Sequence, residues 1–284
     1  DADSVETQEI ESHLARLEEL PADVRDAAAL LRVFGEWRSR SSELYRQAAA
    51  PLALPAVLGP CAKAELLAKW HAAVPSRAQP DEQWWCPLRS MTWHQACAAY
   101  SERCGDGQAL DEAVAERVAV PRAKHVVDRC WDPLVLAQHR PVLCLVQDVL
   151  GCVAQASTAH EVLAGAVCGA LEGALARLTS KDPLLLAGLL ACFAEWRVVL
   201  GDSAAQRVVV DALLVDRVLP LLRSSDAATA AALGAVVRAL PSDWTAQTVP
   251  QLAALAALIK QHAASSSSSA ESDELGVLLK RLAA

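Results

Sequence analysis

Apolar side chains recur along this sequence at the spacing of one helix face. The clearest stripe has six members, and each aliphatic residue follows another at a helical interval of one, three or four positions. Its members are Val142, Leu145, Val146, Val149, Leu150 and Val153. Shorter stripes occur over residues 10–17, 110–118 and 249–259. The pattern predicts amphipathic helices from one end of the chain to the other.

Proline residues mark where several of these helices are expected to begin or break. Asp132-Pro133 and Asp182-Pro183 each place an acidic N-cap before a proline at the first helical position, where the missing N–H is tolerated. Both pairs are therefore expected to open long helices. Pro121 lies inside the apolar stretch of residues 110–130, where it removes a backbone donor. We expect it to break or kink that helix.

Further landmarks indicate where elements end or approach one another. Trp131 is expected to end the element that contains Pro121, and the segment from Pro241 to Trp244 is expected to form a turn between helices. The glycines of the next helix recur every four residues, which predicts close approach of a neighbouring backbone. They are Gly165, Gly169 and Gly173.

We expect the chain to have three parts. Residues 1–29 form an expected N-terminal helical extension, and residues 30–264 form the main helical domain. A run of five serines opens residues 265–284, which are expected to form a linker followed by a short helix or an acidic tail.

The overall composition indicates the same fold class. Apolar residues fill 53% of the 284 positions, yet aromatic residues fill only 4%, and Ala and Leu lead the apolar residues. Ala and Leu favour helices, whereas strands are rich in aromatic residues and isoleucine. The sequence therefore predicts an all-α fold of packed antiparallel helical hairpins without a sheet.

The charge balance restricts the partners. The net charge is −8, and contacts with nucleic-acid phosphates need clustered Lys and Arg. Direct nucleic-acid binding is therefore disfavoured. The uncharged run from Pro183 to Ala194 is interrupted by Glu195 and is shorter than the ~20 residues of a spanning helix, so no membrane segment is expected.

Nine cysteines are present, an odd number without any CxxC pair. A disulfide framework is not expected, and a reducing compartment fits best. Five cysteines lie in apolar helical stretches, where reduced Cys behaves as a small buried hydrophobe. They are Cys130, Cys144, Cys152, Cys168 and Cys192.

A search for reaction chemistry gives one candidate cluster. No P-loop, dinucleotide fingerprint or GxSxG elbow is present. Four zinc-capable side chains, called here the Cys86–Cys104 cluster, are Cys86, His94, Cys97 and Cys104. Their gaps are wider than those of structural zinc sites, so we expect no metal, no cofactor and no catalytic residue. A helical enzyme or zinc protein that uses this cluster is kept as an alternative.

Trp84 and Trp85 stand together in a proline-rich segment, in a chain with eight tryptophans but only two Phe and two Tyr. An exposed pair of indoles would anchor a partner protein. Alternatively, the segment folds back and the indoles cap the helical core. The two residues are our candidates for a partner contact.

A series of motifs in this chain resembles the GC-rich sequence DNA-binding factor-like (GCFC) domain. The resemblance extends over roughly residues 30–264 and depends on the order of the motifs. The order is an F-x-x-W and Y-x-x-A segment with L-x-L-P, a short tryptophan motif, a V-x-x-P step, a W-D-P signature and a final proline-tryptophan turn. The residues that carry it are Phe34, Trp37, Tyr45, Pro55, Trp93, Pro121, Trp131, Asp132, Pro133, Pro241 and Trp244.

The resemblance implies a function that composition and spacing alone do not give. It favours the Pax-binding protein or GC-rich-factor branch, because the glycine-rich G-patch of the tuftelin-interacting branch is not seen in the sequence. It implies a nuclear, non-enzymatic scaffold in pre-mRNA splicing. Its partners would be a G-patch-containing GCFC protein, a DEAH-box helicase and other spliceosome proteins during disassembly of the intron-lariat spliceosome. A sequence-specific DNA-binding transcription factor is the alternative that the family name suggests.

Overall fold

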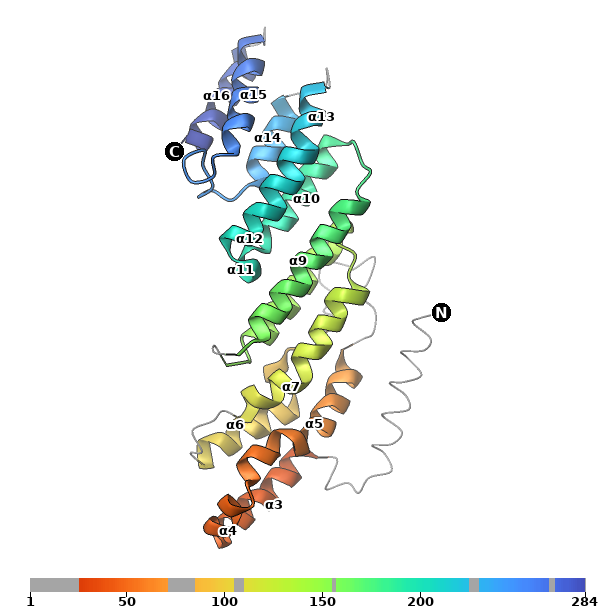
Figure 1. Cartoon of the computed structure of the whole chain (residues 1–284), viewed down its shortest axis with the longest axis vertical. Helices are drawn as coiled ribbons and strands as arrows, with labels where there is room; N and C mark the ends of the chain where they lie inside the picture. The colour runs from red at the N-terminus through yellow and green to blue at the C-terminus, as the bar shows by residue number, and fades with distance from the viewer. Residues whose placement is uncertain are drawn as a thin grey trace. The chain divides into compact units, whose positions relative to one another are not determined.

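The computed structural model describes residues 26–70, 85–104, 110–154, 157–224, 230–265 and 269–283. Within these ranges every regular element is a helix, and no strand occurs (Figure 1). This confirms the predicted all-α fold. Most of the N-terminal extension expected over residues 1–29 lies outside the described residues.

The chain forms two compact units. The first comprises Asp1–Trp131 and Arg140–Ala166, and the second comprises Asp132–His139 and Val167–Ala284. The division falls between Trp131 and Asp132 and within two helices, α8 (Leu136–Leu150) and α9 (Ala159–Arg177). The division into residues 1–29, 30–264 and 265–284 stays a prediction.

The first unit is built from helices that pack in pairs. Its elements are α3 (Ala27–Arg40), α4 (Ser42–Gln47), α5 (Ala50–Lys69), the 3-10 turn η1 (Leu88–Ser90), α6 (Thr92–Cys104), α7 (Leu110–His125) and the π-helical turn η2 (Val126–Cys130). Helix α5 packs against α7, and α6 packs against both α3 and α7. Ala62 of α5 and Ala115 and Ala119 of α7 are fully buried. Such short side chains permit close approach of two helix backbones.

A left-handed residue joins α4 to α5. Ala49 has φ 51° and ψ 31°, a conformation that costs an L-residue roughly 1–2 kcal/mol because Cβ crowds the carbonyl oxygen. Its N–H donates to the carbonyl of Arg46, and Ala50 already belongs to the next helix. Helix α5 therefore begins after only two residues beyond the end of α4.

The apolar stripe of α8 is confirmed over residues 142–149, whereas the break expected at Pro121 does not occur and a kink there stays a prediction. Val142, Leu145, Val146 and Val149 are fully buried. Pro121 lies inside α7, which continues to His125, so the helix does not break there. Both the proline and Arg117, whose carbonyl loses its helical donor, are on the exposed side of the helix. Water can satisfy that carbonyl, which explains why the helix continues.

The two Asp-Pro pairs behave differently. Asp182 caps α10 (Pro183–Glu195) as predicted, and its side chain accepts from the Leu184 N–H at 2.9 Å. Asp132 does not cap a helix, because α8 begins only at Leu136. Its carboxylate instead accepts from the Leu134 N–H at 3.2 Å within a turn.

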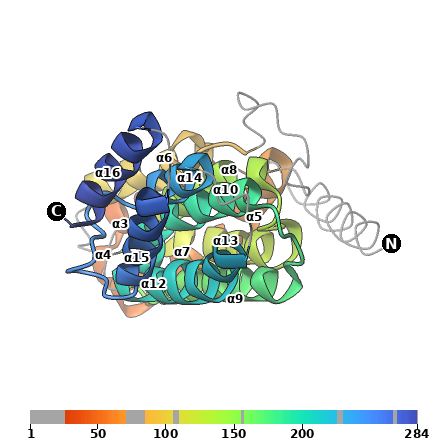
Figure 2. The same ribbon diagram turned by 90° about the horizontal axis from the view of Figure 1, so that it is seen from above.

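The second unit is a group of helices around a leucine- and valine-rich core. After α10 come α11 (Arg197–Leu200), α12 (Asp202–Gln206), the π-helical η3 (Arg207–Val218), α13 (Leu219–Ser224), α14 (Ala230–Ala239), α15 (Leu252–Ser265) and α16 (Ser269–Ala283). Helix α10 packs against α14 and η3, and α16 packs against α14 and α15 (Figure 2). Phe193 and Trp196 fill the centre of this core.

The C-terminal residues form a helix rather than an acidic tail. Helix α16 buries Leu275, Leu278 and Leu282. The Arg281 guanidinium donates to the carbonyl of Leu240 at 2.8 Å, and the carbonyl of Leu282 accepts from the Ala246 N–H at 2.8 Å. The central serines of the expected linker, residues 266–268, lie outside the described part of the chain.

The glycine stripe of α9 does not bring a backbone close. A side chain at Gly165, Gly169 or Gly173 would meet no atom within 4 Å, so the expected close approach is wrong. Without a packing partner, these glycines lower the helix propensity of α9 by about 1 kcal/mol each relative to alanine.

Three helical stretches are long and apolar enough to cross a membrane, judged by length and composition alone. They are Ala50–Lys69, Ala159–Arg177 and Pro183–Leu200, and between 33% and 44% of each apolar window is buried inside the protein. The expectation that no membrane segment exists rested on the uncharged run that Glu195 interrupts. By length and composition, that expectation is not upheld.

A carboxylate from α5 caps the N-terminus of α6. Glu65 accepts hydrogen bonds from the backbone N–H groups of Thr92 at 2.9 Å and Trp93 at 3.2 Å, and from the Thr92 hydroxyl at 2.5 Å. Lys69 also donates to it at 2.6 Å. Burial raises the pKa of Glu65, but these hydrogen bonds outweigh burial and hold its pKa below the ordinary value of 4.5.

We predict that Glu65→Gln lowers the free energy of unfolding by about 1–2 kcal/mol at pH 7, because an N-terminal cap loses its charge. The pKa of Glu65 is lower in the folded state, so the stabilising effect is present above the unfolded value and is lost as pH falls through the folded value. Urea denaturation from pH 7 to pH 3 should show the gap between the two proteins closing. A gap that stays constant would contradict this role.

We also predict that Trp131→Ala lowers the free energy of unfolding by about 3–5 kcal/mol, because this indole is only 6% exposed. The matched variant is Trp37→Ala, since Trp37 is 38% exposed and its removal leaves a smaller cavity. Thermal denaturation of both variants tests the comparison. Equal shifts of the melting midpoint would show that burial does not set the loss.

Candidate interaction site

Aromatic side chains from three helices of the first unit form a connected cluster. Phe34 and Trp37 lie on α3 with ring centroids 6.1 Å apart, and the Trp37 ring meets Tyr45 of α4 edge to face at 5.4 Å. The hydroxyl groups of Tyr45 and Tyr100 of α6 are 2.8 Å apart. Burial and the hydrogen bond to Tyr45 raise the pKa of Tyr100. We call these four side chains the aromatic cluster.

Local capping places this cluster. The Asp26 carboxylate accepts from the Ala28 N–H at 2.9 Å and so fixes the start of α3. The Ser41 N–H donates to the Trp37 carbonyl at 2.9 Å, which ends α3, and the Ser41 carbonyl accepts from the Tyr45 N–H in α4. Trp37 and Tyr45 are thereby held on adjoining helices with almost no intervening loop.

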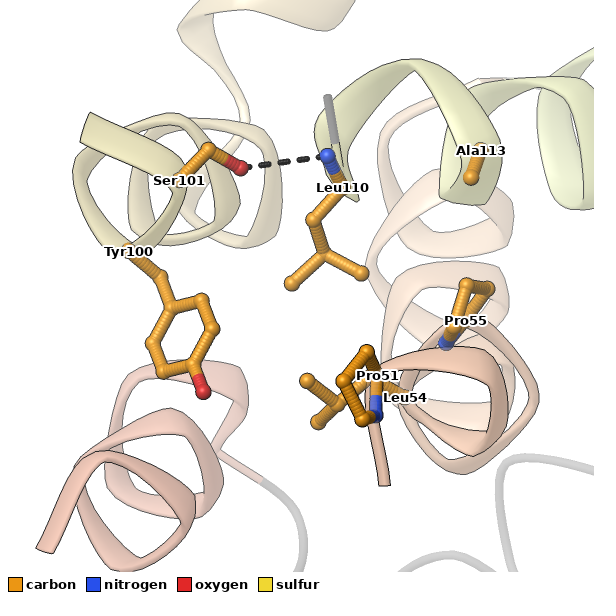
Figure 3. Close-up of a pocket in the computed structure, with 7 residues that line it drawn as sticks. All are labelled: Pro51, Leu54, Pro55, Tyr100, Ser101, Leu110 and Ala113. Atoms are coloured by element: carbon orange, nitrogen blue, oxygen red, sulfur yellow. Dashed lines mark hydrogen bonds between the residues drawn. The ribbon is translucent and has the colours of Figure 1, made fainter. Parts of the chain in front are cut away.

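A small pocket adjoins Tyr100 (Figure 3). Three helices supply its walls, and the Ser101 hydroxyl accepts from the Leu110 N–H at 3.1 Å across it. The lining residues are Pro51, Leu54, Pro55, Tyr100, Ser101, Leu110 and Ala113. Its volume is about 40 Å³, far below the ~300–1,000 Å³ of ligand pockets, so it accommodates solvent rather than a metabolite. The family-motif residue Pro55 thus lies beside the aromatic cluster.

Side chains from α8 and α9 hold the Asp132-Pro133 turn in place. The Asp132 N–H donates to Gln138 Oε1 at 2.9 Å. Arg177 of α9 donates to Asp132 Oδ1 at 3.2 Å. Gln138 and Arg177 thus bind both the backbone and the carboxylate of Asp132. The Asp-Pro part of the W-D-P signature therefore has a structural role in the second unit.

His139 completes this turn as a neutral imidazole. Its Nε2 lies 2.7 Å from the Pro133 carbonyl oxygen, and its Nδ1 lies 3.1 Å from the indole nitrogen of Trp196. The indole can only donate, so Nδ1 accepts and Nε2–H donates to Pro133. Burial lowers the pKa of His139 to about 4, although the bond to Pro133 and the nearby Asp132 oppose that shift. The imidazole therefore stays uncharged at neutral pH.

The Cys86–Cys104 cluster does not converge on one point. Within the described residues, no group of three or more His, Cys, Asp or Glu side chains is placed to hold a metal ion. His94 Nε2 lies 3.9 Å from Asp111 Oδ2, too far for a hydrogen bond. Burial and the Asp111 carboxylate raise the pKa of Cys97 to about 12, so its thiol stays protonated. Because the thiolate is the nucleophile and the metal ligand, this arrangement does not favour the enzyme and zinc alternatives.

All nine cysteines are free thiols, but their burial differs from expectation. Cys152 is buried, whereas Cys130, Cys168 and Cys192 are half-buried and Cys144 is exposed. The prediction of burial is wrong for Cys144. Its neighbours in α8, Leu143 and Leu145, are buried, and Cys144 projects from the opposite side of the helix, where it is exposed.

Only one of the two candidate partner-binding tryptophans can be placed. Trp84 lies outside the described residues, and Trp85 is half-buried just before η1. The carbonyl of the next residue, Cys86, accepts from the Trp70 indole at 2.9 Å, which ties this segment to the end of α5. A partner contact by Trp84 and Trp85 stays a prediction.

The other motif residues lie in or beside the cores of the two units. Trp93 is fully buried, and its indole donates to Met91 Sδ at 3.2 Å. Trp131 ends η2, as predicted. Pro241 and Trp244 form the predicted turn between α14 and α15, where the Trp244 N–H donates to the Pro241 carbonyl at 3.1 Å.

Sequence reasoning missed several residues with important contacts. Glu65 and His139 carry no local signature, because their partners are 27 and 57 positions away along the chain. Tyr100 had one available signal. The chain contains only two tyrosines, and they are hydrogen-bonded to each other.

We predict that Tyr45→Phe and Tyr100→Phe each lower the free energy of unfolding by about 1–2 kcal/mol, because each removes the hydrogen bond between the two buried hydroxyls. The double variant should lose about 1 kcal/mol less than the sum of the single losses. Urea denaturation of the four proteins measures this coupling. Strictly additive losses would show that the two hydroxyls do not stabilise each other.

Comparison with known proteins adds one distant relative. No protein-family model matches the chain. The chain is 27% identical over 248 residues to a protein named transcriptional repressor ILP1 from Arabidopsis thaliana. The alignment covers 76% of this chain but only 26% of that protein, so the chain spans about a quarter of the length of its relative.

Proposed function

We propose that this chain is a non-enzymatic helical scaffold of a nuclear protein that acts in pre-mRNA splicing. The proposal rests on the ordered series of motifs that resembles the GCFC domain. Its partners would be a G-patch-containing GCFC protein and a DEAH-box helicase, and its role would be disassembly of the intron-lariat spliceosome. The similarity to a plant protein named for transcriptional repression supports nuclear localisation only in general terms.

The observation that best supports a scaffold is the aromatic cluster. Phe34, Trp37 and Tyr45 join α3, α4 and α6 through ring contacts and one hydroxyl pair. Residues that hold helices together keep the outer surface of those helices in a fixed shape. This role suits a scaffold better than it suits an enzyme. The neutral His139 and the protonated Cys97 agree with this interpretation, because neither is poised for proton transfer or nucleophilic attack near pH 7.

The proposal includes no direct contact with a membrane. Helix α5 would place Glu65, Lys69 and the exposed Lys63 inside the lipid, although it is long enough to span it. Its apolar side chains Leu54, Leu58 and Leu66 are buried within the first unit instead.

Regulation of transcription is the second candidate, favoured by the name of the distant relative. A repressor that binds duplex DNA needs a cationic surface, and the net charge of −8 opposes this. Repression through protein contacts would use the same kind of helical surface as a splicing scaffold.

We predict that affinity purification of the full chain from nuclear extract, followed by mass spectrometry, recovers spliceosome disassembly factors as the dominant partners. The Trp84→Ala and Trp85→Ala double variant should recover less of them, because Trp85 is only half-buried and tryptophan side chains anchor protein interfaces. Partners restricted to transcriptional corepressors would overturn the splicing proposal in favour of the second candidate.

The control is direct binding to duplex DNA over a series of salt concentrations. A scaffold should show no binding at physiological salt. A DNA-binding factor should bind there with an affinity that falls steeply as salt rises.

A further inference from the structure

An open groove runs along α3 on the side that faces the end of α6. Its volume is about 480 Å³, within the ~300–1,000 Å³ typical of ligand sites. Leu31 and Tyr100 lie beneath its floor, and both side chains are almost fully buried. Gly35 also lines the groove, and a side chain there would lie 3.7 Å from the Tyr100 ring. The missing side chain keeps the groove open beside Tyr100.

The charged residues of this groove are mostly arginines. Arg32 and Arg38 come from α3, and Arg103 comes from the last turn of α6. The single acidic lining residue, Glu36, lies 3.3 Å from Arg40, and the two side chains form an ion pair on α3. The groove therefore concentrates positive charge in a chain whose net charge is −8.

Two of these guanidinium groups are available to a ligand. Arg32 and Arg103 are exposed, and among the described residues no carboxylate forms an ion pair with either. Arg103 Nε donates to the Ala99 carbonyl at 3.1 Å, which fixes the side chain along α6. Guanidinium groups bind carboxylates through two parallel hydrogen bonds, so two exposed arginines on one groove suit an anionic ligand.

The chemistry favours an acidic protein segment over a nucleic acid. A nucleic-acid strand presents an unbroken row of phosphates, which the surrounding negative protein would repel. Glu36 on the groove adds to that repulsion. A short peptide with spaced carboxylates needs only two or three cations, which the groove supplies.

We propose that the groove between α3 and α6 binds an Asp- or Glu-rich segment of a partner protein, with Arg32 and Arg103 as the main carboxylate-binding residues. The function proposed above assigns no ligand to this groove, although Tyr100 of the aromatic cluster lines it. Direct binding to the purified chain also has a readout independent of partner capture from nuclear extract, so the two proposals can fail separately.

The test is fluorescence anisotropy with the full chain and a short labelled peptide of alternating Glu and Ala. The double variant Arg32→Glu and Arg103→Glu should weaken binding at least about tenfold, and affinity should fall with added salt. The control is Arg129→Glu, another exposed arginine of the same unit, which lies in η2 and outside the groove. It should leave affinity within about twofold, and circular dichroism should show all variants equally helical.

Three results would overturn the proposal. The first is absence of binding by the unchanged chain. The second is an equal loss in the Arg129→Glu control, which would indicate unspecific attraction. The third is tighter binding of a single-stranded RNA of matched length that depends on the same two arginines, which would assign the groove to nucleic acid. A matched peptide with Lys in place of Glu should not bind.

Discussion

Close packing of small side chains is the constraint on which the rest of this structure depends. Alanine buries little apolar area, so an alanine-rich chain gains stability only where helices approach closely. Ala62, Ala115, Ala119 and Ala123 are all fully buried in α5 and α7. Large side chains then occupy the few wider spaces, which is where Trp70, Trp93 and Trp196 are found.

Because of this constraint, polar contacts between helices are needed to fix the register of one helix against another. Helices with short side chains slide easily past one another, because their ridges and grooves are shallow. Glu65 on the α6 N-terminus and the Tyr45–Tyr100 hydroxyl pair are directional contacts that fix register. His139 has the same effect in the second unit, where it links Pro133 to Trp196.

The helices could be predicted from sequence because the information that specifies them is local. Apolar spacing identified α8, and Asp182 with Pro183 identified the start of α10. Predictions were wrong where a distant or solvent interaction decides the outcome. Gln138 takes the Asp132 N–H, so the helix begins later than the Asp-Pro pair indicates. Exposure of Pro121 lets α7 continue through it.

The candidate site was partly predictable for the same reason. The motif series identified Phe34, Trp37 and Tyr45, but Tyr100, the hydrogen-bond partner of Tyr45, is 55 positions beyond it, and no spacing rule connects the two. The arginine-lined groove also could not be predicted from sequence, because Arg103 lies beside α3 only in the folded chain. Residues brought together by tertiary packing leave no period in the sequence.

The left-handed Ala49 has a consequence for how this sequence can vary. Only glycine, and to a lesser degree asparagine or aspartate, adopts its φ of 51° with less strain than alanine, and β-branched residues adopt it worst. Substitution at this position is therefore confined to a few residue types, although Ala49 itself is exposed. In a comparison of related sequences, an exposed position that accepts so few side chains would resemble a functional residue. At Ala49, however, the restriction comes from the backbone conformation alone.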